Sequence, residues 1–216
     1  MNTCHQARFP AVILFSLCAL AALIASPAPA GIGGPHGEYS MAYQGPETLT
    51  LFVVPDGSGD TFDQAFLPVG GRVDATITLI LRDAGEQPIA NFPREDMWLE
   101  SEDGGLTPCP MGNIADANTD ANGMTYWQNP MYAGGNSQAL TVVMVSGMLI
   151  EYTVGVPLSY NSPDINADRV VNLTDVQMFT LDFFTGYDFR SDFYRDGVVN
   201  LSDLPALAYA IGAACP

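Results

Sequence analysis

Oxygen-bearing side chains alternate along one short stretch near the C-terminus of this chain. Asp164, Asn166 and Asp168 stand at every second position, and Asn172 and Asp175 follow four and seven residues after the third of them. Ca²⁺ takes about six to eight oxygen ligands, and a loop that alternates ligand and spacer residues can wrap one ion. The spacing therefore predicts a calcium-binding loop.

The same pattern recurs 28 residues further along the chain, where Asp192 corresponds to Asp164. When each copy is numbered from 1 to 12, acids stand at positions 1, 5 and 12 and Asn at position 9, while a Val at position 7 offers its main-chain carbonyl. We call the copies loop one (residues 164–175) and loop two (residues 192–203). The predicted ligands are Asp164, Asn166, Asp168, Val170, Asn172 and Asp175 in loop one, and Asp192, Asp196, Val198, Asn200 and Asp203 in loop two.

The two loops depart from this pattern at different positions. Arg169 stands at position 6 of loop one, where the sharp turn favours Gly, and a non-Gly residue at positive φ costs about 1 kcal/mol. Tyr194 stands at position 3 of loop two, which therefore lacks one side-chain oxygen ligand. We expect one bound Ca²⁺ and at most two, with loop one the better site.

A helical pattern follows each loop, over residues 174–184 and 204–214. The duplicated loop–helix unit, with V-V-N-x-x-D in both copies, resembles a dockerin module. Dockerins are calcium-dependent plugs that dock into cohesin domains, best known from extracellular polysaccharide-degrading complexes. The resemblance covers residues 162–214 and implies association with a cohesin-like or other extracellular protein.

The residues that would meet such a partner differ from the usual ones. Dockerins read cohesin with a polar pair at loop positions 10 and 11, which are Leu173 and Thr174 in loop one and Leu201 and Ser202 in loop two. These four residues are the partner-facing candidates. The two leucines could instead pack against the preceding domain, against neighbouring copies of the chain or against an unfamiliar partner.

Short apolar runs separated by Gly, Asn, Asp and Pro precede the loops. Residues 72–82 alternate most regularly between apolar and polar, and this spacing of short strands is typical of a β-sandwich. The other predicted strands are residues 49–54, 97–100, 125–128, 139–145 and 148–156.

Two turn sequences in this region resemble those of bacterial Ig-like domains of the invasin and intimin kind. They are LRDAGEQPIANF (residues 81–92) and DANTDANGMTYW (residues 116–127), and the matching residues are Asp83, Pro88, Thr119, Asp120 and Gly123. The predicted fold is mainly β: an Ig-like β-sandwich followed by a small α-helical dockerin-like module with two calcium loops. The predicted segments are a signal peptide (1–30), a flexible N-terminal segment (31–47), the sandwich (48–160) and the module (161–216).

Residues 1–30 have the features of a secretory signal. Arg8 precedes an apolar run over residues 11–25, and Ala-x-Ala ends at Ala30. The run is too short for a comfortable membrane span, although an uncleaved anchor is the alternative. We therefore expect a secreted protein, extracellular or at the cell surface, without a membrane span after cleavage.

Charge and cysteine content agree with that location. The chain has no Lys and a formal net charge of −17, so nucleic acid and anionic membranes repel it, whereas divalent cations and basic partners suit it. Adaptation to salty surroundings is the alternative explanation. Cys109 and Cys215 remain beyond the signal, and one disulfide is expected, with free or intermolecular thiols as the alternative.

The sequence offers no clear catalytic constellation. His36 is the one His beyond the signal and lies in a Gly-rich segment, while Cys109 without a nearby His is a poor nucleophile candidate. Trp98, Tyr126 and Trp127 could form a sugar-stacking platform or fill a core. We therefore predict a non-catalytic association protein. The alternatives are a structural subunit in which calcium only stabilises the fold, and a carbohydrate-binding module.

Overall fold

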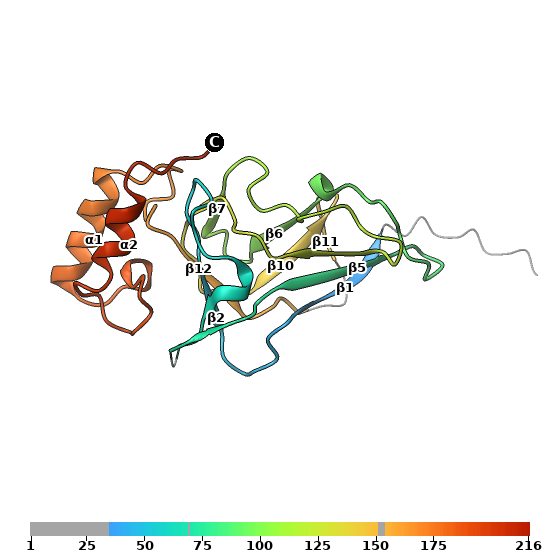
Figure 1. Cartoon of the computed structure of the whole chain (residues 1–216), viewed down its shortest axis with the longest axis horizontal. Coiled ribbons are helices and arrows are strands. Elements are labelled where there is room, and N and C mark those ends of the chain that lie inside the picture. Colours follow the sequence, from blue (N-terminus) through green and yellow to red (C-terminus); the bar gives the residue numbers. More distant parts are fainter. Residues whose placement is uncertain (1–34, 69, 151–153) are drawn as a thin grey trace, which may run out of the picture. The chain divides into compact units, whose positions relative to one another are not determined.

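The computed structural model describes residues 35–68, 70–150 and 154–216. In these residues the chain is mainly β, as predicted, with several sheets and two α-helices (Figure 1). The predicted signal peptide lies outside the described residues, as do residues 31–34 of the predicted flexible segment and residues 151–153 of the predicted strand 148–156. No helix among the described residues is long and apolar enough to cross a membrane.

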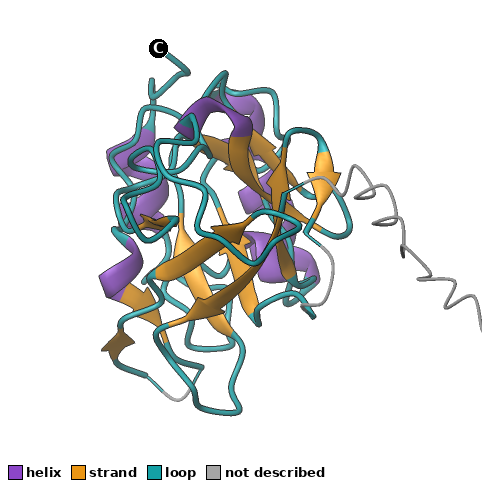
Figure 2. Ribbon diagram, turned by 90° about the vertical axis from the view of Figure 1, so that its right-hand side faces the viewer, coloured by secondary structure: helices purple, strands orange, loops and turns teal. Residues whose placement is uncertain are grey.

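Two three-stranded antiparallel sheets form much of the β-rich part, by which we mean residues 35–160 (Figure 2). Their strand orders are β1-β5-β8 and β11-β10-β6, and a separate ladder pairs β7 with β9. The bounds are β1 (His36–Met41), β5 (Ile77–Arg82), β6 (Met97–Ser101), β7 (Leu106–Pro108), β8 (Met124–Trp127), β9 (Ala133–Gly135), β10 (Thr141–Val145) and β11 (Met148–Leu149).

A further sheet with the order β12-β2-β3-β4 leads into the C-terminal region. In it, β12 runs parallel to β2, with Leu158 opposite Leu49. Because β12 ends at Asn161, this pairing sets where the tail (residues 161–216) begins. The bounds are β2 (Leu49–Phe52), β3 (Ala65–Phe66), β4 (Arg72–Val73) and β12 (Leu158–Asn161), and short 3₁₀ helices lie at Phe62–Gln64, Arg94–Asp96 and Phe189–Ser191.

The segment predicted as one strand over residues 72–82 is two strands, β4 and β5. Asp74 lies between them and accepts a hydrogen bond from the main-chain N–H of Thr76 at 2.8 Å, which closes a local turn and interrupts the ladder. Within β5 the expected alternation holds, since Ile77, Leu79 and Leu81 are fully buried.

The N-terminal segment predicted to be flexible contains a strand instead. Residues 36–41 form β1, which pairs antiparallel with β5 along its whole length. Its inward residues, Tyr39 and Met41, are buried in the main core. His36 also lies on this strand rather than in a linker, and its Nε2 is 3.1 Å from Oε1 of Glu86. The neighbouring glycines hid the alternation of Tyr39 and Met41 with polar residues.

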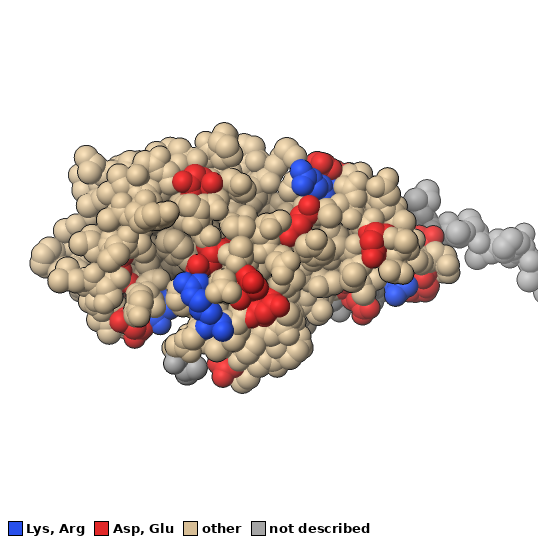
Figure 3. Space-filling view, viewed as in Figure 1, with Lys and Arg blue, Asp and Glu red and all other residues tan. Residues whose placement is uncertain are grey.

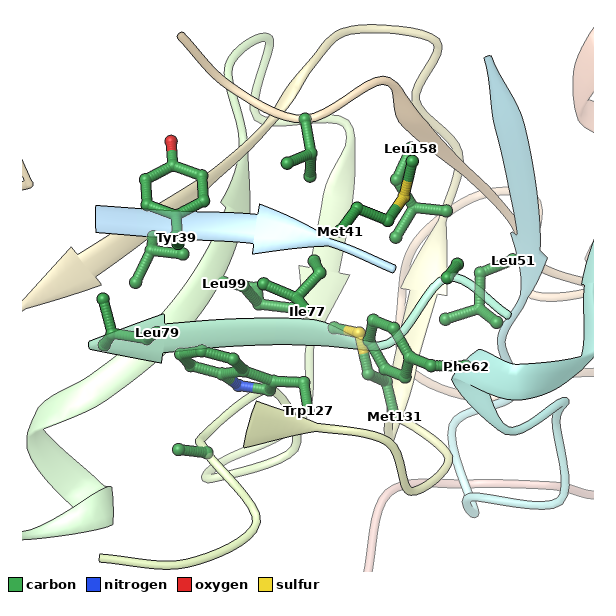
Figure 4. Packing of buried hydrophobic residues seen from close by; sticks show 14 of the residues in the cluster. Tyr39, Met41, Leu51, Phe62, Ile77, Leu79, Leu99, Trp127, Met131 and Leu158 are labelled. Atoms are coloured by element: carbon green, nitrogen blue, oxygen red, sulfur yellow. The ribbon is translucent and has the colours of Figure 1, made fainter. Parts of the chain in front are cut away.

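The main core fills the β-rich part and draws on most of its strands (Figure 4). Trp127 is its largest fully buried side chain, and its indole N–H donates to the carbonyl of Asn113 at 3.0 Å. That hydrogen bond satisfies the polar end of a ring that otherwise lies among apolar groups. Labelled members in Figure 4 are Tyr39, Met41, Leu51, Phe62, Ile77, Leu79, Leu99, Trp127, Met131 and Leu158.

The tail carries the two α-helices, α1 (Leu173–Thr185) and α2 (Leu204–Ala210). They correspond to the helices predicted over residues 174–184 and 204–214, but α2 ends earlier. Gly212 takes a φ of 92°, and the N–H of Gly212 donates to the carbonyl of Val171 at 2.9 Å. The chain after α2 therefore turns away from the helix axis and pairs with loop one.

A second, smaller hydrophobic cluster lies in the tail, yet it is not made by the tail alone. Phe179 of α1 stacks on Phe193 at 6.0 Å between ring centroids, and Leu207 of α2 is buried beside them. Val54 and Phe52, which belong to the β-rich part, also pack in this cluster. The β-rich part and the tail accordingly belong to one unit, Gly31–Pro216.

Candidate metal centre

Loop one and loop two have the same hydrogen-bond pattern around their buried carboxylates. At position 1, Asp164 or Asp192 accepts from the main-chain N–H groups of positions 5 and 6, at 3.1 and 2.8 Å in loop one and 3.2 and 3.0 Å in loop two. At position 12, Asp175 or Asp203 accepts from the N–H groups of positions 3 and 9, at 3.1 and 2.8 Å and at 2.8 and 2.9 Å. These bonds fold both loops around the same carboxylates.

Positions 5, 7 and 9 converge in both loops as well. The amide nitrogen of Asn172 donates to Oδ2 of Asp168 at 3.5 Å and to the carbonyl of Val170 at 3.1 Å. In loop two the amide nitrogen of Asn200 makes the corresponding bonds to positions 5 and 7, both at 3.4 Å. The predicted ligands at positions 5 and 7 of each loop are thus brought together around the amide of position 9.

The backbone at positions 4 and 6 has a positive φ in both loops. Ala167 and Arg169 take φ values of 60° and 71°, and Arg195 and Gly197 take 62° and 81°. Arg169 therefore adopts the strained conformation expected of position 6, at the cost that a non-Gly residue carries there. The hydrogen bonds to Asp164 hold the turn in place against that cost.

The carboxylates at positions 1 and 12 are buried, whereas those at position 5 are exposed. Asp164, Asp175 and Asp203 are 0% exposed and Asp192 is 2% exposed. Burial, together with the charges of Asp175 and Asp168, raises the pKa of Asp164 to about 6, against the opposing effect of main-chain hydrogen bonds. Burial likewise raises the pKa of Asp203. Buried carboxylates of like charge need a compensating cation.

The donor set of loop one fits a hard cation. It combines carboxylate, amide and carbonyl oxygens, which are the ligands that Ca²⁺ prefers. No group of three or more His, Cys, Asp or Glu side chains in residues 35–68, 70–150 and 154–216 is arranged to hold a metal by itself. A cation in loop one would therefore depend on Asn166, Asn172 and the carbonyl of Val170 together with the carboxylates.

The loops differ at position 3. Asn166 accepts from the N–H of Asp168 at 3.1 Å and donates to Oδ2 of the same residue at 2.9 Å, so its amide lies beside a predicted ligand. Tyr194 in loop two contributes only its main-chain N–H to the network, and its side chain is 61% exposed. Loop two accordingly offers fewer oxygen atoms to an ion.

The valines at position 8 do not pair with each other. Val171 donates to the carbonyl of Ala213 at 2.8 Å and accepts from Gly212, so both of its main-chain groups bind the C-terminal segment. The expected disulfide between Cys109 and Cys215 is present, and the N–H of Cys215 donates to the carbonyl of Arg169 at 3.2 Å. The disulfide therefore fastens loop one to the β-rich part.

Loop one also touches the β-rich part directly, which the sequence did not reveal. The N–H of Gly135 in β9 donates to the carbonyl of Asp164 at 2.9 Å. A Cβ placed on Gly134 would overlap with Oδ2 of Asp164, so only Gly allows the carboxylate to lie against this strand. The glycines of β9 were the available signal, since a strand Gly often marks close approach of another group.

Loop two meets a different set of residues. Asn161, at the end of β12, donates from its amide to the carbonyls of Phe189 and Asp192 at 2.6 and 3.2 Å. Arg195 donates to Oγ1 of Thr50 at 2.7 Å and to the carbonyl of Asp192 at 3.2 Å, and its guanidinium lies over the Phe189 ring at 4.0 Å. Burial lowers the pKa of Arg195, while the negative charge of Asp192 opposes that shift.

The partner-facing candidates all lie at the surface. Leu173 is 72% exposed and Leu201 is 70% exposed, and Thr174 and Ser202 beside them are also exposed. Neither leucine packs against the β-rich part. Other exposed apolar side chains of the tail are Leu181, Phe184, Tyr209 and Ile211.

The three rings considered for sugar stacking do not share a surface. Trp127 is buried in the core, and Tyr126 next to it on β8 points to the opposite face of the sheet, as strand geometry requires. Trp98 belongs to another sheet, where its indole N–H donates to Oε1 of Glu100 at 2.7 Å. On the face drawn in Figure 3, basic side chains are few and acidic side chains lie around them.

Comparisons of this chain with protein-family models, curated proteins and solved structures give no match.

Proposed function

We propose that this chain is a secreted, non-catalytic calcium-binding protein that associates with another protein outside the cell. In this proposal residues 48–160 form an Ig-like β-sandwich and residues 161–216 form a dockerin-like module. One observation carries the proposal: the duplicated acidic sequence folds into two loops with matching hydrogen bonds, including those at positions 1, 5, 9 and 12.

Calcium has a clear physical role in loop one. Asp164 and Asp175 are buried within the same small loop and repel each other. A divalent cation would cancel that repulsion and give the carboxylates a partner that the surrounding residues do not provide. Within the described residues, neither carboxylate forms an ion pair with an Arg or His side chain. Asp164, Asn166, Asp168, Asn172, Asp175 and the Val170 carbonyl would hold the ion.

The exposed leucines at position 10 support the association. Leu173 and Leu201 occupy equivalent places in the two copies, and both present their side chains to solvent. Exposed apolar residues that cluster on one region of a soluble protein often mark an interaction site. The partner would be a cohesin-like or other extracellular protein, in a polysaccharide-degrading or cell-surface assembly.

Calorimetric titration of Ca²⁺ into the chelator-treated protein tests the metal part of this proposal. We expect binding heat at one equivalent, and its loss in Asp168→Ala, where an exposed carboxylate can be removed with little disturbance of the core. Absence of binding at millimolar Ca²⁺ in the folded protein would exclude calcium function. Association is tested by affinity capture in calcium and in chelator, with Leu173→Asp and Leu201→Asp as variants that should lose the partner.

A second function is favoured by the way the tail is held. The disulfide, the contact of Asp164 with β9 and the bonds of Arg195 fix the tail to the β-rich part at several points. Such a chain could be a structural subunit of an extracellular assembly, in which calcium only stabilises the fold. Calcium-dependent self-association without a foreign partner, measured by analytical ultracentrifugation, would favour this reading over the first.

A further inference from the structure

We propose that loop two takes no cation and instead fastens the tail to the β-rich part, with Arg195 supplying the positive charge that loop one would take from calcium. The inference rests on the proposed calcium function of loop one. It goes further because it assigns different tasks to two loops that share one hydrogen-bond pattern.

The two loops have different residue types at positions 3 and 4. Loop one has Asn166 and Ala167 there, so it has an amide oxygen to offer and no charge of its own. Loop two has Tyr194 and Arg195, so it has lost that oxygen and gained a cation. The two changes act in the same direction, because each of them lowers the affinity of a loop for a metal ion.

The second argument is where the guanidinium of Arg195 lies. It donates to the carbonyl of Asp192, the residue at position 1, and the charges of Asp192 and Asp203 both favour its charged form. Among the described residues Arg195 forms no ion pair with either carboxylate, so its charge acts on Asp192 and Asp203 at longer range. Loop two thus has a partly buried cation within its own turn, whereas the Arg of loop one, Arg169, is exposed.

The third argument is that Arg195 also reaches out of the loop. Its guanidinium donates to Oγ1 of Thr50 in β2 at 2.7 Å. The rings of Phe52 in β2 and Phe193 in loop two also meet edge to face, with 6.0 Å between their centroids. Asn161 binds the carbonyl of Asp192 from the other side at 3.2 Å. Loop two is thus held by β2 and β12 through contacts that do not involve its carboxylates.

Stoichiometry separates the two loops. Ca²⁺ titrations of the unaltered protein, Asp168→Ala and Asp196→Ala compare the exposed position-5 carboxylates, which are a matched pair. We expect one equivalent, lost in Asp168→Ala and retained in Asp196→Ala. Two equivalents, or loss of binding in Asp196→Ala, would overturn the inference and leave calcium binding intact. No binding in the folded protein would instead refute the proposed function.

The role of Arg195 in fastening the tail to the β-rich part is measured in chelator, so that the result does not depend on calcium binding. Arg195→Gln should lower the melting temperature, whereas Arg169→Gln, an exposed Arg of loop one, should leave it nearly unchanged. Equal melting temperatures for both variants would contradict the role given to Arg195. Tyr194→Asn with Arg195→Ala copies the residues of loop one into loop two and should create a second calcium equivalent. A folded double variant that still takes one ion would also contradict it.

Discussion

Loop one and loop two have nearly the same internal hydrogen bonds but different surroundings. In loop one the carboxylate at position 1 lies against a glycine strand, β9, and the loop is joined through its backbone to the C-terminal disulfide. In loop two the main-chain carbonyl of the equivalent residue, Asp192, accepts from the guanidinium of Arg195 and the amide of Asn161, which lead to β2 and β12. Internal hydrogen bonds define the fold of a loop, while its neighbours define what it can bind.

This comparison explains how a duplicated sequence can acquire two roles. The acids at positions 1 and 12 are needed in both copies because they accept the main-chain N–H groups that close the loop. They would be needed for this structural reason even in a loop that binds no metal. At position 3 only the main-chain N–H belongs to the common pattern, so the side chains at positions 3 and 4 are free to differ, as Asn166 and Ala167 do from Tyr194 and Arg195.

Removal of the disulfide should have the largest effect and should separate the loops most clearly. The bond joins residues 106 positions apart, and closing a loop of that length stabilises by about 5 kcal/mol on the chain-entropy model. Cys109→Ala with Cys215→Ala should lower the free energy of unfolding by about that amount. The rate of amide hydrogen exchange should rise more at Val171 than at Asn200, because in the described residues loop one pairs with the C-terminal segment through Val171. Equal rises would show that the disulfide supports both loops alike.

The close approach of β9 to Asp164 predicts the next largest effect. Gly134→Ala places a Cβ where Oδ2 of Asp164 lies, so the carboxylate or the strand must move. We expect a loss of about 3 kcal/mol in urea unfolding, in the upper range for overpacking, and weaker calcium binding in loop one. Gly85→Ala is the control, because its Cβ would meet only Oδ1 of Asp83, at 3.3 Å. If Gly134→Ala unfolds at the same urea concentration as Gly85→Ala, the contact is not a constraint.

Acidity should act on loop one through Asp164. Its folded pKa of about 6 lies above the ordinary value of 3.8, so the folded state holds the proton more tightly. Without calcium, the contribution of this group to the free energy of unfolding is therefore largest below pH 4 and falls as pH rises through 6, by about 3 kcal/mol. Asp164→Asn should flatten this part of the unfolding profile in chelator, and saturating calcium should reverse its slope. A flat profile in the unaltered protein would mean that burial does not raise the pKa of Asp164.

Much of this architecture follows from local sequence patterns. The alternation of Ile77, Leu79 and Leu81 marks β5, and Asp83 and Asp120 act in turns by accepting main-chain hydrogen bonds. The two loops could be predicted because the ligand spacing of a calcium loop and the cap of the following helix use the same residues. In α1, for example, Asn172 and Asp175 form a capping box.

Contacts between distant segments could not be predicted from local sequence patterns. β1 was missed because its pairing with β5 depends on residues some forty positions away, while its own sequence is short and flanked by glycines. The bond from Arg195 to Thr50 spans 145 positions, and no local pattern indicates it. Likewise the pairing of Val171 with Ala213 depends on where the chain turns after α2, which is decided by the disulfide and the second hydrophobic cluster.

The smallest expected effect compares the two position-9 residues. Asn172 is the N-cap of α1 and accepts from the N–H of Thr174 at 2.8 Å. Asn200 accepts from the N–H of Ser202 at 2.7 Å, but this bond caps no helix, because α2 begins at Leu204 with Asp203 as its N-cap. Asn172→Ala should therefore cost about 1 kcal/mol in chelator, and Asn200→Ala should cost clearly less. In calcium the gap should widen, because Asn172 is then also a ligand and Asn200 is not. Urea unfolding of both variants, with and without calcium, measures this difference directly. If calcium widens the penalty of Asn200→Ala equally, loop two binds the ion as well and the division of roles between the loops is wrong.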